Sequence, residues 1–112
     1  MITVEKPKQF MKLTNQVPDP VLYMMLIKEE FEEFWDSDPD DSAHELKEMC
    51  DLIYVILGYA ASKGYDIDWA FDLVHRNNLG RCITDGDVRR DAGGKIIKNE
   101  SYKPVNLEEC LP

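Results

Sequence analysis

The sequence predicts an all-α fold of antiparallel helices with a short irregular or hairpin C-terminal tail. Three stretches carry apolar residues at helical spacing, and turn-forming residues separate them. A chain of 112 residues, of which 44% are apolar, can bury one modest core. We therefore expect a single domain over residues 1–112, made of a helical core over 19–80 and a tail over 81–112.

The first two helices have clear start signals. Asp19 is placed to cap a helix over residues 20–35, which opens with a proline whose missing N–H costs nothing there. Ser42, as the N-cap, and Glu45 match a capping box for a second helix that continues to residue 63. Because the connection between the two helices is short, we expect them to lie antiparallel.

The remaining elements are shorter. Residues 67–79 form a third amphipathic stretch that we expect to end at Gly80, and a short helix is expected within residues 4–13. Beyond the third helix, an Asp-Gly pair at 85–86 and a Gly-Gly pair at 93–94 are turn signals. The tail is therefore predicted to form a small hairpin or an ordered loop.

The composition disfavours several classes of protein. No apolar run reaches the roughly 20 residues that cross a bilayer, and the first residues carry charges in place of an apolar signal core. Three cysteines without CxxC spacing argue against a disulfide framework or a zinc knuckle. The formal net charge of −9 disfavours binding to nucleic acid polymers. We expect a cytoplasmic protein without a membrane or nucleic acid partner.

The acidic residues are concentrated in the middle of the chain. Residues 29–51 hold 11 of the 22 acidic residues and one base, Lys47. A surface that only needs to be soluble does not require such a concentration. This segment is therefore where a cation, or a function, should be sought.

Four carboxylates interrupt the apolar stripes of the two long helices. On a helical wheel, Glu30 and Glu33 fall within the apolar face of the first helix. Glu48 and Asp51 repeat the same spacing on the second helix. On antiparallel neighbours the two pairs meet across the interhelical gap, where like charges repel strongly without a counter-charge. A solvated acidic surface does not explain acids inside apolar stripes.

The expected counter-charge is a hard divalent cation, because all four side chains offer oxygen ligands. Magnesium fits best, with Mn²⁺ as an alternative. Di-iron bundle proteins use a Glu-x-x-His pair, and neither histidine of this chain stands three residues after any of the four acids. Magnesium that keeps several waters is the usual partner of phosphate-bearing substrates, which favours phosphoanhydride chemistry.

These motifs resemble a known family. Residues 29–33 (EEFEE) followed by residues 48–51 (EMCD) resemble the EExxE…ExxD signature of the all-α nucleoside triphosphate pyrophosphatases, the MazG-like and phosphoribosyl-ATP pyrophosphohydrolase-like group. The run DLIYVILGYAASKGYDIDWAFDLVHRNNLGR over 51–81 and the Asp-Gly, Gly-Lys and Tyr-Lys-Pro elements of the tail resemble its small stand-alone members.

The resemblance implies Mg²⁺-dependent hydrolysis of a nucleoside or deoxynucleoside triphosphate to the monophosphate and pyrophosphate. It implies that Glu30, Glu33, Glu48 and Asp51 are the metal ligands and that Glu29 is the catalytic candidate, as a general base or a group behind the ligands. Which carboxylate accepts the proton stays open from the sequence, and so do the base and sugar of the substrate.

Phosphates also need amide or cationic donors outside the acidic segment. Asn78 extends the inward face of the third helix, and Arg81 follows it by about a turn. Lys95 and Lys98 lie beyond the Gly-Gly pair, on a segment able to approach the site. These four residues are the candidate substrate-binding groups, although for each lysine an ordinary solvated charge is an equal alternative.

The second helix also predicts an oligomer. Residues 52–61 are apolar on every side, which three short helices from one chain cannot fully cover. We therefore expect a homodimer or homotetramer that completes a four-helix-type bundle. A monomer in which the N-terminal segment and the tail cover this helix is the alternative.

A second functional hypothesis is a helical dimerisation or adaptor module without catalytic activity, whose acids only keep the chain soluble. The two hypotheses differ in their response to metal. An enzyme of this kind should be stabilised by Mg²⁺, because the cation relieves carboxylate repulsion in the folded state, whereas an adaptor should not.

Overall fold

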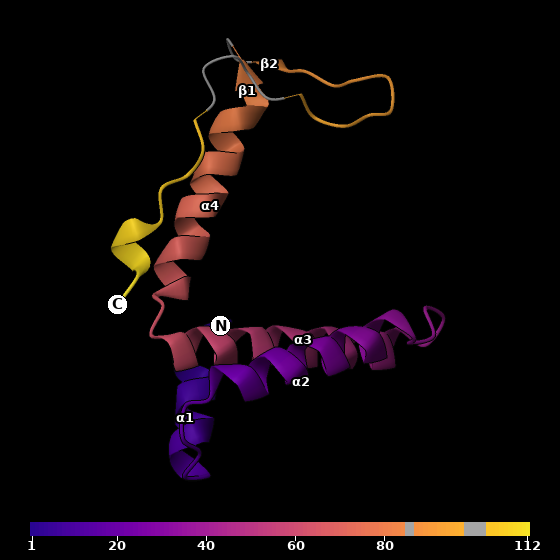
Figure 1. Ribbon diagram of the computed structural model, residues 1–112. Helices are drawn as coiled ribbons and strands as arrows, with labels where there is room; N and C mark the ends of the chain where they lie inside the picture. Colours follow the sequence, from indigo (N-terminus) through magenta and orange to yellow (C-terminus); the bar gives the residue numbers. More distant parts are fainter. Residues whose placement is uncertain (85–86, 98–102) are drawn as a thin grey trace. The chain divides into compact units, whose positions relative to one another are not determined.

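The computed structural model describes residues 1–84, 87–97 and 103–112, and it confirms the predicted all-α class (Figure 1). The described elements are α1 (Glu5–Leu13), α2 (Pro20–Trp35), α3 (Ser42–Lys63), α4 (Ile67–Cys82), β1 (Ile83–Thr84), β2 (Asp87–Val88) and the single-turn 3-10 helix η1 (Glu108–Cys110). No described helix is long and apolar enough to cross a membrane. The chain forms two compact units, residues 1–67 with Pro112 and residues 68–111. The single domain over 1–112 therefore stays a prediction.

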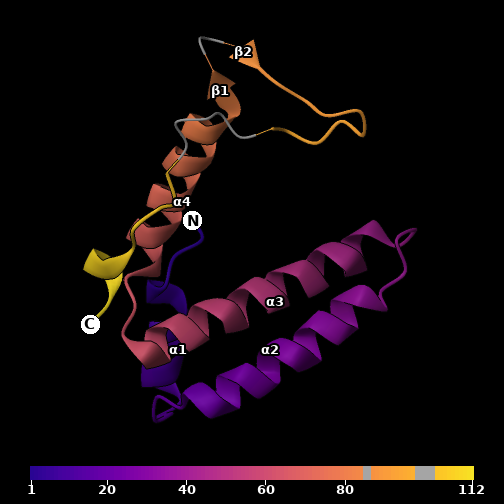
Figure 2. The same cartoon turned by 45° about the horizontal axis from the view of Figure 1, so that its top comes forward.

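In the first unit, α2 and α3 lie side by side and antiparallel, as predicted (Figures 1 and 2). Asp19 caps α2, because its carboxylate accepts a hydrogen bond from the Leu22 N–H at 3.1 Å. The capping box predicted at Ser42 is wrong. Asp41, one residue earlier, is the N-cap of α3 and accepts from the His44 N–H at 3.2 Å, so Ser42 is already helical.

The core of this unit lies where α1 crosses the end of the α2–α3 pair (Figure 2). Met11, Tyr23 and Val55 are buried there against one another. The Tyr23 hydroxyl donates a hydrogen bond to Gln16 Oε1 at 3.2 Å. Gly58 of α3 faces the Tyr23 ring so closely that a Cβ at this position would overlap the ring. The missing side chain therefore lets α2 and α3 approach each other closely.

The second unit begins with α4, whose predicted end at Gly80 is wrong. The helix runs on to Cys82, because Gly80 does not take the left-handed backbone that ends a helix, as Gly64 does after α3 with φ of 73°. β1 and β2 then pair antiparallel, with Ile83 opposite Val88, which confirms the predicted hairpin. Its expected turn at 85–86 lies outside the described residues.

A second turn and a strap complete this unit. Gly94 has a φ of 84° within the turn predicted at residues 93–94. Residues 103–111 then run back along α4 (Figure 1). Asn77 Nδ2 donates to the Lys103 carbonyl at 2.9 Å, and Trp69 Nε1 donates to Glu109 Oε1 at 3.1 Å. These two bonds fasten the strap to α4.

Candidate metal centre

Three of the four predicted ligands come together in the first unit. Glu30 and Glu33 lie on successive turns of α2, and Glu48 lies on α3. One carboxylate oxygen from each lies within 4.8 Å of the others. The spacing of three residues puts both α2 acids on one face, and the antiparallel pairing brings that face against α3. The two helices therefore gather three carboxylates at one place.

The cluster contains polar atoms whose hydrogen-bonding needs are not met. Glu48 is 5% exposed. Oε2 of Glu30 and Oε2 of Glu48 are both buried and have no hydrogen-bond partner among the described residues. A buried carboxylate oxygen without a partner costs free energy, so an arrangement with two of them is unfavourable unless a cation or water meets them.

The negative charges of the cluster also repel one another, which again favours binding of a cation. Burial, then a hydrogen bond with Glu33, and then the negative charges of Glu33, Asp51 and Glu48 raise the pKa of Glu30 from 4.5 to about 7. A raised carboxyl pKa means that the protonated form is favoured in this environment. The cluster therefore holds more negative charge than its surroundings stabilise.

Asp51, the fourth predicted ligand, is engaged elsewhere. Its Oδ2 lies 2.6 Å from Lys47 Nζ, one turn earlier on α3, and it is not among the three residues whose oxygens cluster. Lys47 Nζ is also 3.9 Å from Glu48 Oε1, and His44 Nε2 is 3.2 Å from the same oxygen. The hydrogen bond to Asp51, followed by the charges of Asp51 and Glu48, raises the pKa of Lys47.

The residues present fit a hard divalent cation. All three clustered residues offer carboxylate oxygens, and Glu30 and Glu48 each have one buried oxygen without a partner among the described residues. Oxygen donors of this kind suit Mg²⁺, Mn²⁺ or Ca²⁺ better than softer metals. Glu30, Glu33 and Glu48 would hold such a cation. Asp51 would join them after leaving Lys47, and its role as a ligand stays a prediction.

The predicted catalytic residue, Glu29, precedes Glu30 on α2 and is exposed. Among the described residues, its side chain forms no hydrogen bond or ion pair with the three clustered carboxylates, and its role as a general base stays a prediction. Exposure is compatible with a group that meets its proton donor only when substrate is bound.

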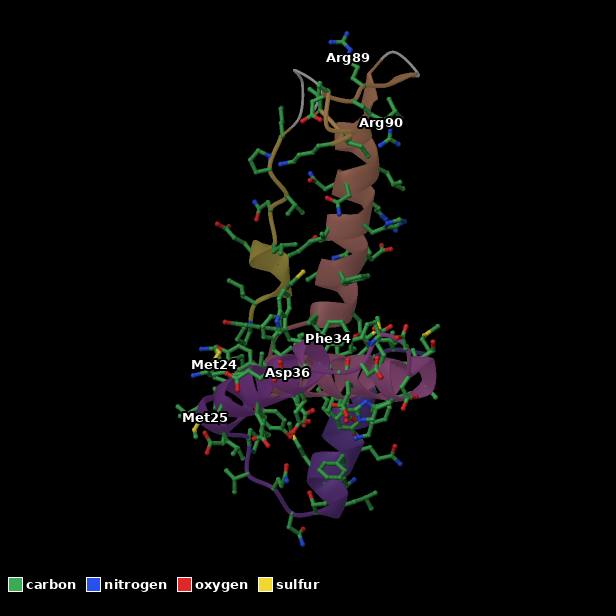
Figure 3. All side chains as sticks on the ribbon, turned by 90° about the vertical axis from the view of Figure 1, so that its right-hand side faces the viewer. Met24, Met25, Phe34, Asp36, Arg89 and Arg90 are labelled. Atoms are coloured by element: carbon green, nitrogen blue, oxygen red, sulfur yellow. The ribbon has the colours of Figure 1, made fainter. Side chains whose placement is uncertain are left out.

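The four candidate substrate-binding residues belong to the second unit, and their role stays a prediction. Asn78 is exposed on α4, and Arg81 lies in the last turn of that helix. Lys95 is exposed, and its backbone N–H donates to Asp91 Oδ1 at 2.9 Å. Lys98 lies outside the described residues. Figure 3 shows two further bases of this unit, Arg89 and Arg90, on the segment after β2.

Two neighbours of the cluster with nitrogen-bearing side chains were not predicted from the sequence. His44 stands four residues before Glu48, and Lys47 stands four residues before Asp51. The same i, i+4 spacing places each base next to its acid on the surface of α3. That spacing was visible in the sequence and is the signal that could have identified both residues.

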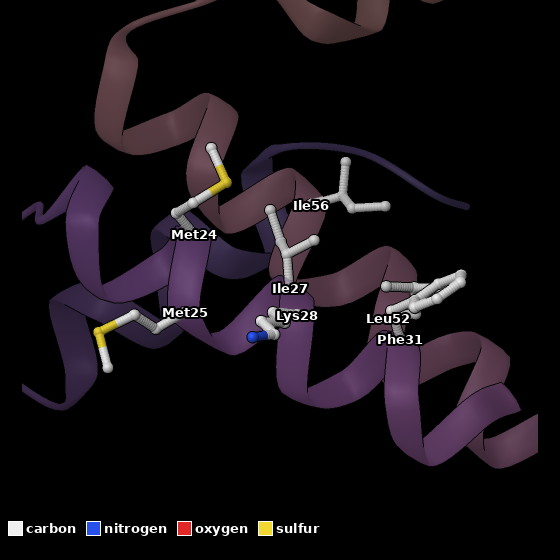
Figure 4. A pocket seen from close by; sticks show the side chains of 7 residues that line it. All are labelled: Met24, Met25, Ile27, Lys28, Phe31, Leu52 and Ile56. Atoms are coloured by element: carbon white, nitrogen blue, oxygen red, sulfur yellow. The ribbon is translucent and has the colours of Figure 1, made fainter. Parts of the chain in front are cut away.

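An apolar groove of about 550 Å³ lies on the α2–α3 pair (Figure 4). Its α2 side includes Met24 and Met25, which are 53% and 66% exposed and are labelled in Figure 3. Its full lining is Met24, Met25, Ile27, Lys28, Phe31, Leu52 and Ile56. Part of the apolar segment predicted at 52–61 is thus left uncovered by the rest of its own unit.

Comparison with known proteins identifies the family. A model of the phosphoribosyl-ATP pyrophosphohydrolase family matches residues 3–78, which cover α1, α2, α3 and most of α4. The match includes every residue of the carboxylate cluster. No curated protein matches the chain significantly. The chain therefore belongs to the phosphoribosyl-ATP pyrophosphohydrolase family, within the MazG-like all-α nucleoside triphosphate pyrophosphatases, which implies pyrophosphohydrolase activity on the phosphoanhydride bonds of nucleotides.

Proposed function

We propose that this protein is a Mg²⁺-dependent pyrophosphohydrolase that converts a nucleoside or deoxynucleoside triphosphate to the monophosphate and pyrophosphate. The observation that carries the proposal is the group of three carboxylates on α2 and α3, whose oxygens lie within 4.8 Å of one another. Two of these side chains have a buried oxygen without a described partner. Family membership adds support, because its pyrophosphohydrolases typically depend on a divalent metal.

In this proposal Glu30, Glu33, Glu48 and Asp51 hold Mg²⁺, which Mn²⁺ can replace. When bound, the cation supplies positive charge to the phosphate oxygens and makes a water molecule easier to deprotonate. Glu29 takes the proton of the attacking water as the general base. It is suited to this role because it is exposed on the helix that carries two of the ligands and needs no rearrangement of the core.

The substrate's phosphates are also bound by groups of the second unit. Asn78, Arg81, Lys95 and Lys98 are the proposed contacts, because they supply amide and cationic donors that the acidic segment lacks. A triphosphate that carries Mg²⁺ remains negatively charged, so these donors offset its repulsion by the acids that do not bind the metal.

We also propose that the chain is a cytoplasmic homodimer or homotetramer. The apolar groove on α2 and α3 supports this, since Phe31 at 48% exposed and Ile56 at 39% exposed would be covered by a second copy. Light scattering should give at least twice the 13.0 kDa of one chain. A mass of one chain at micromolar concentration would contradict the oligomer and leave the metal site as proposed.

The test of the activity is a screen for pyrophosphate release by the purified protein. The substrates are the canonical and deaminated nucleoside triphosphates and phosphoribosyl-ATP, each with Mg²⁺ and with a chelator. Pyrophosphate and a monophosphate should appear only with metal, and Glu48→Gln should remove the signal. If no substrate is hydrolysed and Mg²⁺ does not raise the melting temperature, the adaptor hypothesis replaces this proposal.

A further inference from the structure

Lys47 is a positively charged side chain that lies against the acids of α3 in the first unit. It is the one lysine in the acidic segment 29–51, which contains no arginine. Its ammonium lies 2.6 Å from Asp51 Oδ2 and 3.9 Å from Glu48 Oε1, so it contacts the two acids predicted as ligands on α3. A single cation thus lies against half of the predicted ligand set.

We propose, on the basis of the metal site described above, that Lys47 is the counter-ion of the metal-free centre and competes with the divalent cation for Asp51. In the metal-free protein its ammonium offsets the charge of the α3 acids and keeps Asp51 away from the other three carboxylates. Metal binding requires Lys47 to release Asp51. The lysine therefore stabilises the metal-free protein and weakens its affinity for the cation.

The geometry agrees with a carboxylate of Asp51 that pairs either with Lys47 or with the divalent cation. Only Asp51 of the four predicted ligands is missing from the clustered group, and it is the acid that Lys47 contacts most closely. An ammonium and a divalent cation both require the negative charge of the same carboxylate oxygens, so one carboxylate serves them alternately at the least cost.

The Lys47 side chain is also able to move away from Asp51 into solvent. Its side chain is 66% exposed, so its stem is not held by a packed core. Lysine is a flexible, strongly hydrated point charge, and its ammonium gains water when it turns to solvent. An arginine bound bidentately in a buried site would give up more contacts on release. The residue type therefore suits a counter-ion that is replaced.

The matched comparison is Lys47→Met against Lys28→Met, both measured on the full chain. Each variant removes one positive charge near the carboxylates and keeps an unbranched stem. Lys28 lies two residues from Glu30, forms no ion pair with any described residue and lines the apolar groove, so its variant reports net charge and any effect of the groove while the Lys47–Asp51 pair stays intact. Glu30 and Lys28 point from different sides of α2, and the control leaves the α3 acids untouched.

Two readouts apart from activity decide the proposal. In chelator at low salt, Lys47→Met should lower the melting temperature by about 2–5 °C, whereas Lys28→Met should not lower it. In Mg²⁺ titrations followed by calorimetry, Lys47→Met should lower the dissociation constant about fivefold relative to Lys28→Met. With saturating Mg²⁺ the difference in melting temperature should disappear.

Three results would overturn the proposal. They are weaker Mg²⁺ binding by Lys47→Met than by the wild type, equal changes in affinity for the two lysine variants, and an unchanged melting temperature of metal-free Lys47→Met. None of these affects the proposed function if the wild type still releases pyrophosphate with Mg²⁺. A wild type that binds no divalent cation would overturn both.

Discussion

The two carboxylate pairs of the first unit have the same spacing but different charge compensation. On α3, Glu48 and Asp51 each have a base one turn earlier, His44 at 3.2 Å and Lys47 at 2.6 Å. On α2, Glu30 and Glu33 have no ion-pair partner among the described residues. The unbalanced charge is therefore on the α2 side, where the pKa of Glu30 rises to about 7.

This difference in charge compensation indicates which carboxylate pair needs a cation. Carboxylates that contact basic side chains are repelled less in the metal-free protein than carboxylates that face only further acids. In the metal-free protein, the α3 acids are held in place by basic neighbours on the same helix. The α2 acids lack such neighbours, so their uncompensated charge attracts a cation. The following experiments test this division.

The largest effect is expected from removing an acid of the α3 pair. Glu48→Gln and Asp51→Asn should each lower Mg²⁺-dependent turnover about 100-fold or more, because each removes a charged ligand. Circular dichroism of the metal-free variants should show unchanged helix content, because loss of one charge reduces repulsion. Wild-type rates in either variant would show that the residue is not a ligand.

The next effect tests whether positive charge from the second unit also acts on the substrate. Lys95→Gln should raise KM about tenfold through loss of a phosphate contact, while Mg²⁺ affinity without nucleotide stays unchanged. Lys103→Gln is the matched control, since Lys103 is exposed and its described bond to Asn77 uses the backbone carbonyl. Equal kinetic constants for Lys95→Gln and the wild type would leave Asn78 and Arg81 as the described candidates.

A third effect concerns the approach of the two helices that hold the pairs. Gly58→Ala should cost about 1–2 kcal/mol of unfolding free energy, because the new Cβ overlaps the Tyr23 ring and outweighs the gain in helix propensity. Gly80→Ala is the control: its Cβ would meet no atom within 4 Å, so it should stabilise α4 by up to about 1 kcal/mol. Urea unfolding measures both, and a stabilised Gly58→Ala would contradict the close packing.

The smallest effect is the pH dependence of the metal-free protein. The pKa of Glu30 is raised from 4.5 to about 7, so between these values the folded state holds a proton that the unfolded state has lost. Stability in chelator should therefore fall by a few degrees of melting temperature as the pH rises through this range. Glu30→Gln should flatten the fall, and saturating Mg²⁺ should reverse it above pH 7.

Glu32→Gln is the control for this pH dependence, because Glu32 is exposed on the same helix. Its melting temperature should follow the pH as the wild type does. If the melting temperatures of Glu30→Gln and Glu32→Gln depend on pH in the same way, the fall in stability comes from the net charge of the protein. The raised pKa of Glu30 is then not its cause.

Much of the fold could be predicted from the sequence because it depends on local signals. Apolar periodicity and Asp19 define α2, and the repeated three-residue spacing puts each carboxylate pair on one face. The errors are at helix ends. Asp41 caps α3 in place of the neighbouring Ser42, and α4 continues through Gly80, because adjacent residues offer nearly equal caps and glycine does not oblige a helix to stop.

Less of the candidate site than of the fold could be predicted from the sequence. The clustering of Glu30, Glu33 and Glu48 was predicted from their spacing. The ion pair between Lys47 and Asp51 was not, because an i, i+4 neighbour on the same helix competes with the partners across the interhelical gap. The exposed apolar groove depends on how the side chains of two helices meet, which no spacing within one helix reveals.

The most direct test of the metal centre is a calorimetric titration of Mg²⁺ into wild-type protein and Glu48→Gln, without nucleotide. Glu48 is the most buried of the clustered acids and has an oxygen without a described partner, so its neutralisation should remove the site. We predict saturable binding by the wild type and no saturable binding by the variant. Equal binding by both proteins would contradict a metal centre formed by the carboxylates of α2 and α3.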